Sequence, residues 1–181
     1  MIAPLLVAVV ALLLLAAAFW DVATMTIPNW LSAAVALLFP IAAIAAGVPW
    51  HGIAFNVAFG AAMLLGCFFL FNAGILGGGD AKLIPAAAMW TGAAGFAPFA
   101  LVMALAGGLV ALVVVAMRRT MAPSEEKPEF LNRLLDKKRG LPYGVAIAAG
   151  FLLTFAQSPL ASLIQAQMGA AETAQASLTL P

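Results

Sequence analysis

Charge is what this chain has least of. Only 8% of its 181 residues are Asp, Glu, Lys or Arg, whereas 65% are hydrophobic and the mean hydropathy is +1.11. A soluble domain carries roughly 25% charged residues, so this composition excludes a soluble globular protein and makes lipid the solvent for most of the surface. The few basic residues gather in one short loop, which excludes a nucleic-acid-binding protein.

Cysteine and histidine are almost absent as well. A single cysteine, Cys67, excludes a disulfide framework and a CxxC metal site, and we expect it to be a small buried side chain. The single histidine, His51, follows Trp50, where we expect residues of the membrane interface. No charged region precedes the first apolar run, and no A-x-A site is followed by a mature soluble domain, which predicts a first membrane span rather than a cleaved signal.

Long apolar runs dominate what remains. Runs of about 17–25 residues cross a bilayer, and the sequence predicts about six such segments, at residues 2–20, 31–46, 53–71, 81–94, 96–117 and 141–163. We therefore predict an all-α, polytopic membrane protein with about six transmembrane helices, the fourth short or broken. Residues 1–164 would form one transmembrane domain, and residues 165–181 a poorly ordered tail.

The basic residues predict the orientation of these segments. The polar loop 118–140 follows the fifth segment and holds all of the 8 Lys and Arg residues except Lys82, so the positive-inside rule places it in the cytoplasm. Asp21 follows the first segment and Asp80 the third, which puts both acids on the cytoplasmic side and both termini on the other. If the fourth segment does not cross, the acids still share a face, but the loop moves to the opposite one.

The polar loop 118–140 mixes both signs of charge. We interpret it as a solvated segment with a short amphipathic helix around residues 130–135. Contact with substrate or with anionic lipid is the alternative.

Small residues recur in two of the apolar segments. In the third segment they stand every four positions, at Ala58, Ala62 and Gly66, and Gly74 follows two such steps later. In the fifth segment, Gly107 and Gly108 are adjacent. Such spacing predicts close packing of helices in lipid.

Two acids stand at the ends of apolar runs. Asp21 opens the stretch D-V-A-T-M-T-I-P-N, and Asp80 closes G-G-G-D. An ionised side chain inside a bilayer costs about 2.5–3.5 kcal/mol on insertion scales, so both acids are candidates for function.

Two carboxylates that lie close together cannot both ionise at low energetic cost. One is protonated while the other stays charged, and such a pair can activate water while it protonates a peptide carbonyl.

The glycines before Asp80 fit a site for an extended peptide. Gly77, Gly78 and Gly79 permit positive φ and the close approach of another backbone. A break in the helical backbone at membrane depth is tolerated only where it is buried in protein or lines a wet cavity.

Three motifs in this chain resemble those of the type IV prepilin peptidases. G-G-G-D-A-K-L fits the G-x-G-D motif of intramembrane-type aspartic proteases, with Gly77, Gly79 and Asp80 on its defining positions. The stretch from Asp21 to I-P-N resembles the family's first catalytic motif, and L-P-Y-G-V-A-I-A at 141–148 resembles a third block. The resemblance implies a bacterial inner-membrane aspartic endopeptidase that removes the short leader of prepilin-like proteins on the cytoplasmic side. It implies Asp21 and Asp80 as the catalytic pair and no metal or organic cofactor.

The start of the chain narrows this resemblance. Longer members of the family carry an N-terminal methylation region with paired CxxC motifs, whereas this chain begins with an apolar run and has one cysteine. It thus resembles the short, peptidase-only branch associated with Tad/Flp-type pili, and we do not expect it to methylate its product. The expected partners are prepilin or pseudopilin substrates and membrane lipid, and the oligomeric state stays open.

The remaining site candidates belong to the same three motifs: Pro28, Asn29, Lys82, Pro142, Tyr143 and Gly144. Lys82 either biases the acid pair or meets a substrate carboxylate, or it reaches from a helix end to the membrane interface. Asn29 either hydrogen-bonds near Asp21 or forms a turn and caps a helix. Tyr143 either lines the site or is an interfacial anchor.

Two other classes of protein fit part of this pattern. A small transporter or channel component also uses broken helices and intramembrane acids, but its site usually lies near the midplane between internal repeats, and this sequence has no clear repeat. Presenilin-like proteases share the G-x-G-D motif but carry a different first motif and generally more spans. The I-P-N after Asp21 favours the prepilin peptidases.

Overall fold

The computed structural model describes residues 2–137 and 139–179, and every regular element in these residues is a helix. The elements are α1 (Ile2–Thr24), α2 (Asn29–Ala45), α3 (Trp50–Asn72), α4 (Asp80–Thr120), α5 (Glu129–Leu135), α6 (Gly144–Thr154), the 3-10 helix η1 (Phe155–Gln157) and α7 (Pro159–Thr179). The prediction of an all-α fold is confirmed for this part of the chain.

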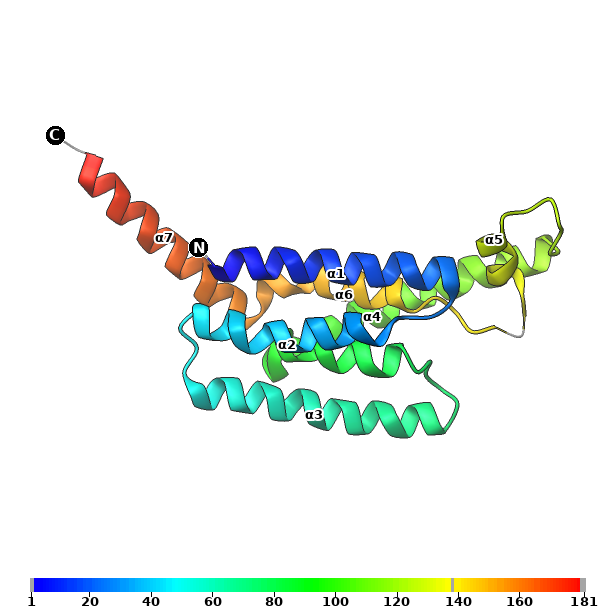
Figure 1. The fold of residues 1–181 in the computed structure, drawn as a ribbon, viewed down its shortest axis with the longest axis horizontal. Coiled ribbons are helices and arrows are strands. Elements are labelled where there is room, and N and C mark those ends of the chain that lie inside the picture. Colours follow the sequence, from blue (N-terminus) through cyan, green and yellow to red (C-terminus); the bar gives the residue numbers. More distant parts are fainter. Residues whose placement is uncertain (1, 138, 180–181) are drawn as a thin grey trace.

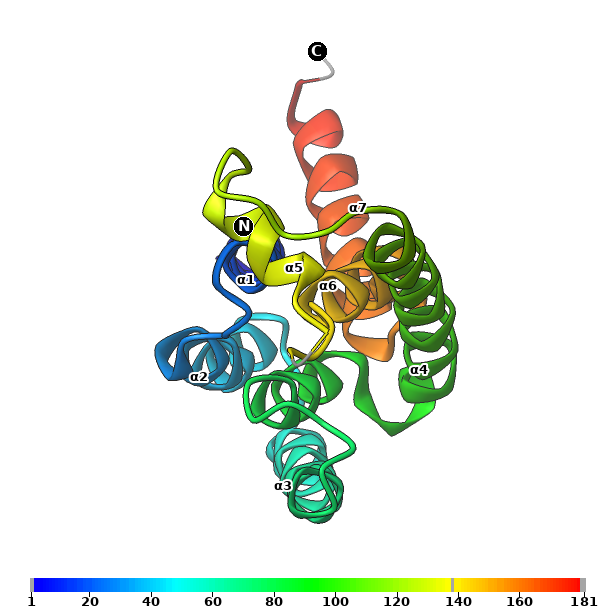
Figure 2. The ribbon, with the colours of Figure 1, turned by 90° about the vertical axis from the view of Figure 1, so that its right-hand side faces the viewer.

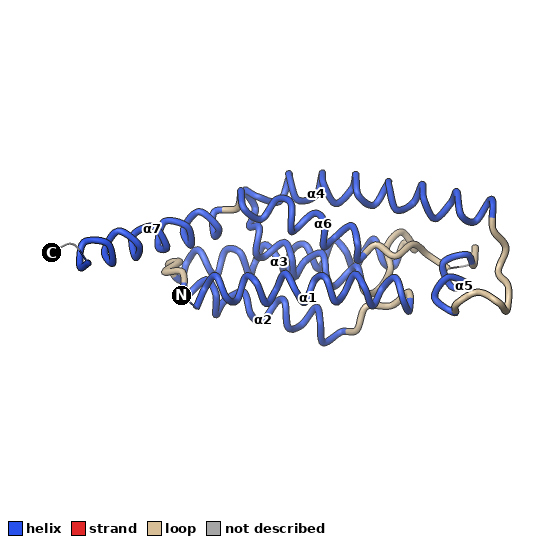
Figure 3. The backbone as a smooth tube through the Cα atoms, turned by 90° about the horizontal axis from the view of Figure 1, so that it is seen from above, coloured by secondary structure: helices blue, strands red, loops and turns tan. Residues whose placement is uncertain are grey.

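The long helices lie side by side along the long axis of the molecule (Figures 1 and 3). The chain reverses between α1 and α2, between α2 and α3, and between α3 and α4, whereas α7 continues away from the bundle after α6 (Figure 1). One end of this bundle holds the last turns of α1 and α3, the starts of α4 and α6, and helix α5 (Figure 1). The starts of α1 and α7 lie at the opposite end. Seen along the bundle, α3 stands at its edge, beside the first part of α4 (Figure 2).

Helix α4 is broken at Gly92, where φ is 65° and ψ is 172°. Beyond this residue the chain turns back along the bundle: Gly95 lies close to Ser158, whereas Gly107 lies close to Tyr143, near the start of α6. The prediction placed the break between residues 94 and 96, and the structure places it a few residues earlier. The part of α4 before Gly92 is about 18 Å long at 1.5 Å per residue, shorter than the ~30 Å hydrocarbon core.

The predicted count of about six spans is not confirmed. Among the described residues, 3 helices are long and apolar enough to cross a membrane, namely α1, α3 and α4, and the bent pair Gly144–Gln157 and Pro159–Ala171 makes up to 4. Helix α2 has 17 residues and is shorter than the others. In this count α4 is one helix although it is broken at Gly92, and the sixth predicted segment bends by 52° after η1.

The segment after residue 165 also differs from its prediction. The sequence predicts a poorly ordered tail there, whereas α7 continues to Thr179. Alanine and glutamine, which are frequent in this segment, have high helix propensity. In the polar loop, α5 (Glu129–Leu135) agrees with the predicted short amphipathic helix, and it buries Leu134 and Leu135.

The predicted packing stripe on α3 is wrong. Ala58, Ala62 and Gly66 are exposed, while α3 buries Gly60 and Cys67 instead. A Cβ at Gly60 would lie 2.5 Å from Cγ of Met89 in α4, so the close approach of the two helices occurs on another face of α3. The prediction that Cys67 is buried is confirmed.

The first part of α4 packs against α2 through Trp90. The indole N–H of Trp90, which is buried, donates to the carbonyl oxygen of Val35 at 2.9 Å. The ring of Phe39 meets that of Trp90 edge-on, with 5.8 Å between the ring centroids. Because the buried indole N–H has an acceptor, this contact carries no desolvation penalty from an unpaired donor. It ties α4 to α2 just before the break at Gly92.

The break at Gly92 is testable by substitution. We expect Gly92→Ala to lower the stability by about 1–2 kcal/mol, because an L-residue at positive φ is strained and its Cβ would lie 3.1 Å from Oδ1 of Asn56. Gly95→Ala is the matched control, since its Cβ would make contacts of 3.4 Å and longer. The measurement is the midpoint of thermal unfolding in detergent, and equal midpoints for the two variants would contradict the assigned conformation.

Candidate active site

Asp21 lies near the end of α1 and is buried, with 6% of its surface exposed. Its Oδ2 accepts a hydrogen bond of 2.7 Å from the backbone N–H of Gly144, the first residue of α6. The first N–H groups of a helix have no partner inside the helix, so this one is available to a carboxylate. The bond joins two residues that are 123 positions apart in the chain.

Asp80 is the first residue of α4 and is also buried, with 8% of its surface exposed. The backbone N–H of Gly77 donates to its carboxylate. A Cβ at Gly77 would lie 2.8 Å from Oδ2 of Asp80, so any other residue there would displace the carboxylate. The two backbone donors, one from the start of α6 and one from the glycine loop, each hold one acid.

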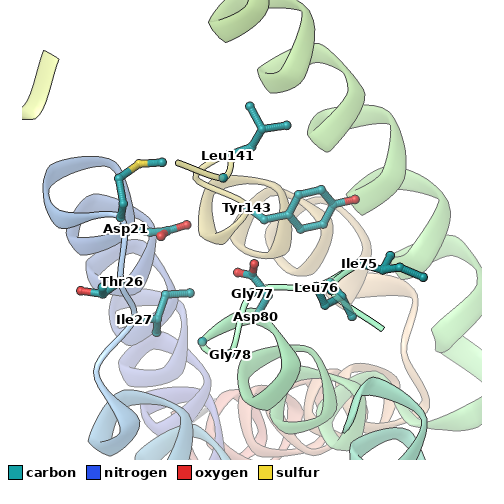
Figure 4. Close-up of a pocket in the computed structure, with 14 residues that line it drawn as sticks. Asp21, Thr26, Ile27, Ile75, Leu76, Gly77, Gly78, Asp80, Leu141 and Tyr143 are labelled. Atoms are coloured by element: carbon teal, nitrogen blue, oxygen red, sulfur yellow. The ribbon is translucent and has the colours of Figure 1, made fainter. Parts of the chain in front are cut away.

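Both acids border one cavity of about 870 Å³ at the end of the bundle. Figure 4 shows the carboxylate of Asp80 rising from the start of α4 below Tyr143, and that of Asp21 pointing from α1 towards the start of α6. The other lining residues come from the loops that follow α1 and α3 and from the segment before α6: Met25, Thr26, Ile27, Gly74, Ile75, Leu76, Gly77, Gly78, Gly79, Gly140, Leu141 and Tyr143.

The glycine loop allows close approach rather than unusual dihedral angles. Gly74 has a φ of 71°, but residues 77–79 all lie outside the positive-φ region. Instead, a Cβ at Gly79 would lie 2.8 Å from Cβ of Ile27 and 3.2 Å from its backbone nitrogen. The sequence suggests two properties for these glycines, positive φ and close approach of another backbone. The structure shows the close approach, because the loop packs directly against the segment between α1 and α2.

Tyr143 closes the cavity from the side of α6. It lies just before this helix, and its ring rests on Gly107 of α4, where a Cβ would lie 2.5 Å from Cε2 and 2.7 Å from the hydroxyl oxygen. This contact places the ring of Tyr143 between α4 and the cavity that both acids border.

The other predicted site residues lie beside the cavity rather than in its lining. The ammonium group of Lys82 donates to Oδ1 of Asn29 at 2.8 Å, which links the start of α4 to the start of α2. Both side chains are exposed. Pro28 directly precedes α2, and Pro142 is buried.

Several lining residues were missed by the sequence analysis. Met25 has a φ of 59°, unusual for a residue with a side chain, and its N–H donates to the carbonyl oxygen of Asp21 at 2.7 Å where α1 ends. Thr26 and Leu141 stand inside the quoted motifs, which is a signal that was available. Ile75 and Leu76 read only as loop residues, and nothing in their spacing points to the cavity.

No metal-ligating cluster accompanies the acids. Within residues 2–137 and 139–179, no three side chains of His, Cys, Asp or Glu are placed together to hold an ion. The cavity offers two carboxylates, a tyrosine hydroxyl and loop backbone groups. Such a set can bind water and an extended peptide, and it can move protons between them.

Fold and site together define a polytopic membrane protein with a paired-acid cavity at one end of its helices. The sequence model of the type IV leader peptidase family matches residues 8–112, which is more than half of the chain and includes Asp21 and Asp80. The chain therefore belongs to the type IV leader peptidase family and is a protease of that kind. No curated protein and no solved structure matches it.

The placement of Tyr143 predicts the effect of a small change in α4. Gly107→Ala would push the Tyr143 ring out of its seat, and we expect kcat/KM for leader removal to fall roughly tenfold, less than the ~100-fold that misplacing a reacting group by 1 Å can cost. A Cβ at the neighbouring Gly108 meets no atom within 4 Å, so Gly108→Ala serves as the control and should behave as the wild type. Unchanged kinetics for Gly107→Ala would mean that the tyrosine has no part in the site.

Proposed function

We propose that this protein is a membrane aspartic endopeptidase that cuts the short basic leader from prepilin-like proteins, with Asp21 and Asp80 as its catalytic pair. The observation that carries the proposal is that two buried carboxylates, 59 positions apart (80 − 21), open into one cavity. The family supplies the class of reaction. Among the described residues, neither acid forms an ion pair with a basic side chain. Both carboxylates are therefore available for proton transfer.

The pair would act on a water molecule between the two carboxylates. One carboxylate takes a proton from the water, whose oxygen adds to the carbonyl carbon of the scissile peptide bond, while the protonated partner donates to the carbonyl oxygen. Breakdown of the tetrahedral intermediate then breaks the C–N bond as a proton passes to the leaving amine. Because two interacting acids titrate as a unit, neither has a fixed role at the start of the cycle.

The glycine loop would shape the approach of the substrate. A protease must hold an extended peptide beside its acids, and the loop 77–79 presents backbone without side chains along one wall of the cavity. The substrate's own apolar helix would lie in the membrane between helices, with the bond to be cut delivered at the helix end. Residues on the far wall, such as Leu141 and Tyr143, would cover the peptide.

The proposed active site faces the cytoplasm. Arg118 and Arg119 end α4 at the same end of the bundle as both acids, and α5 of the basic loop also lies there (Figure 1). Basic loops are retained on the cytoplasmic side. We propose six segments in the inner membrane, in which the part of α4 before Gly92 is a short fourth segment and the rest of α4 the fifth. Both termini then lie outside the cytoplasm.

The branch of the family is part of the same proposal. We assign the chain to the short, peptidase-only form associated with Tad/Flp-type pili, because it has a single cysteine and thus no paired CxxC motifs. Residues 1–164 would be the peptidase domain.

The catalytic pair is tested by removing one charge at a time. Asp21→Asn and Asp80→Asn keep the shape of each side chain, and we expect each to lower kcat for leader removal about 10³-fold or more, as loss of one member of a catalytic unit does. The readout is the shift in size of a co-expressed prepilin. Glu125→Gln, an exposed acid of the polar loop, is the matched control. Full processing by either Asp variant would exclude the pair as the catalyst.

The competing classes are separated by mapping the product. A cut just before the substrate's apolar helix fits prepilin processing, whereas a cut inside that helix would indicate a presenilin-like protease. Ion flux into proteoliposomes without any peptide cleavage would instead favour a transporter or channel component, which also places acids in broken helices.

A further inference from the structure

A clamp of backbone carbonyls surrounds the side chain of Arg118 at the end of α4. Its Nε donates to the carbonyl oxygen of Leu134 at 2.7 Å, and one terminal nitrogen donates to those of Gly140 at 2.8 Å and Arg139 at 3.2 Å. The planar guanidinium presents several donors in a fixed fork, so one half-buried side chain can hold two separate stretches of the polar loop.

The first of these carbonyls belongs to the end of α5. Carbonyl groups in the last turn of a helix lack donors inside the helix and favour a nearby positive charge. Leu134 and Leu135 are buried beneath this turn, so α5 is held both by apolar packing and by Arg118. The other two carbonyls, which accept from the neighbouring terminal nitrogen, belong to the point where the loop turns towards the cavity.

From that point the chain leads directly to the catalytic acid. Gly140 and Leu141 line the cavity, and Gly144, only four positions after Gly140, donates its N–H to Oδ2 of Asp21 at 2.7 Å. Pro142 stiffens the link between them, because its own φ is fixed and the residue before it is restricted. A displacement of Gly140 is therefore transmitted to the N–H that holds the carboxylate.

We infer that Arg118 is a positioning residue for the active site. It holds the segment 140–144 so that the Gly144 N–H meets Asp21 and so that Leu141 and Tyr143 cover the cavity. Arg118 does not line the cavity itself and touches no reacting atom. The inference rests on the proposed role of Asp21, and it adds a cytoplasmic-loop contact to the machinery of the proposed reaction.

The test compares two neighbouring arginines. Arg118→Met keeps the apolar stem of the side chain but removes every donor, whereas Arg119→Met removes the same charge from an exposed side chain one position away. Steady-state kinetics use the full-length protein in detergent with a prepilin substrate. In parallel, each variant is combined with Cys67→Ala and Leu141→Cys, and the rate at which the introduced thiol reacts with a maleimide reports the position of the loop.

For Arg118→Met we expect kcat to fall about 10- to 100-fold, the order that a ~1 Å misplacement costs, with KM changed less than about threefold and with faster thiol labelling. Arg118→Lys should recover part of both effects, and Arg119→Met should match the wild type. If Arg118→Met does not accumulate, Arg118→Gln replaces it, with a smaller effect in the same direction.

Three results would overturn the inference: wild-type kcat in spite of faster labelling, a rise of KM alone, or equal losses for Arg118→Met and Arg119→Met. The failure of the proposed function is distinguishable, because it appears as full processing by Asp21→Asn, whatever the labelling of the loop.

Discussion

The site depends on one hydrogen bond, from the backbone N–H of Gly144 to Oδ2 of Asp21. A carboxylate that leaves water must find a donor inside the protein or lose several kcal/mol of solvation. The unpaired N–H at the start of α6 is such a donor, and the dipole of the helix favours a negative charge there. A side chain at this position would crowd the acid, since a Cβ at Gly144 would lie 3.1 Å from Cβ and Oδ2 of Asp21. The first helix of the chain is thereby tied to the segment that covers the cavity.

Glycines make the other close contacts around this end of the bundle possible. Gly79 allows the close approach of Ile27, and Gly107 that of the Tyr143 ring. The break at Gly92 turns α4 back, so that its last residues lie at the end of the bundle that holds the acids. In lipid, where helices gain little from burying apolar surface against each other, close packing over small residues is the main source of association. The polar loop then needs an anchor of its own, and the Arg118 guanidinium supplies hydrogen bonds to three carbonyls.

Much of this arrangement could be predicted from the cost of polarity in an apolar chain. Asp21 and Asp80 stand out because a bilayer penalises them, and parity of the apolar runs places them at one end, where the structure has them as well. The acids, Tyr143 and the glycine loop stand in the quoted motifs, and in the structure they line one cavity.

The spacing of small residues predicted the wrong packing face of α3. Small residues occur on more than one face of this helix, and only the packing against α4 selects Gly60. The Lys82–Asn29 bond and the Arg118 clamp join residues far apart in sequence, and no local pattern encodes which carbonyl or amide a long basic side chain will reach. The number of spans was the weakest prediction, since it depends on how a broken α4 and a bent α6–α7 pair lie in the bilayer.

The central claim is that Asp21 and Asp80 act together on one peptide bond. The most direct measurement is an experimental structure of the protein with a prepilin-derived peptide in which a hydroxyl-bearing isostere replaces the scissile bond. The account predicts that this hydroxyl lies about 2.6–3.2 Å from a carboxylate oxygen of both acids, within hydrogen-bond reach of each. A bound peptide whose isostere hydroxyl contacts only one of them, or neither, would contradict it.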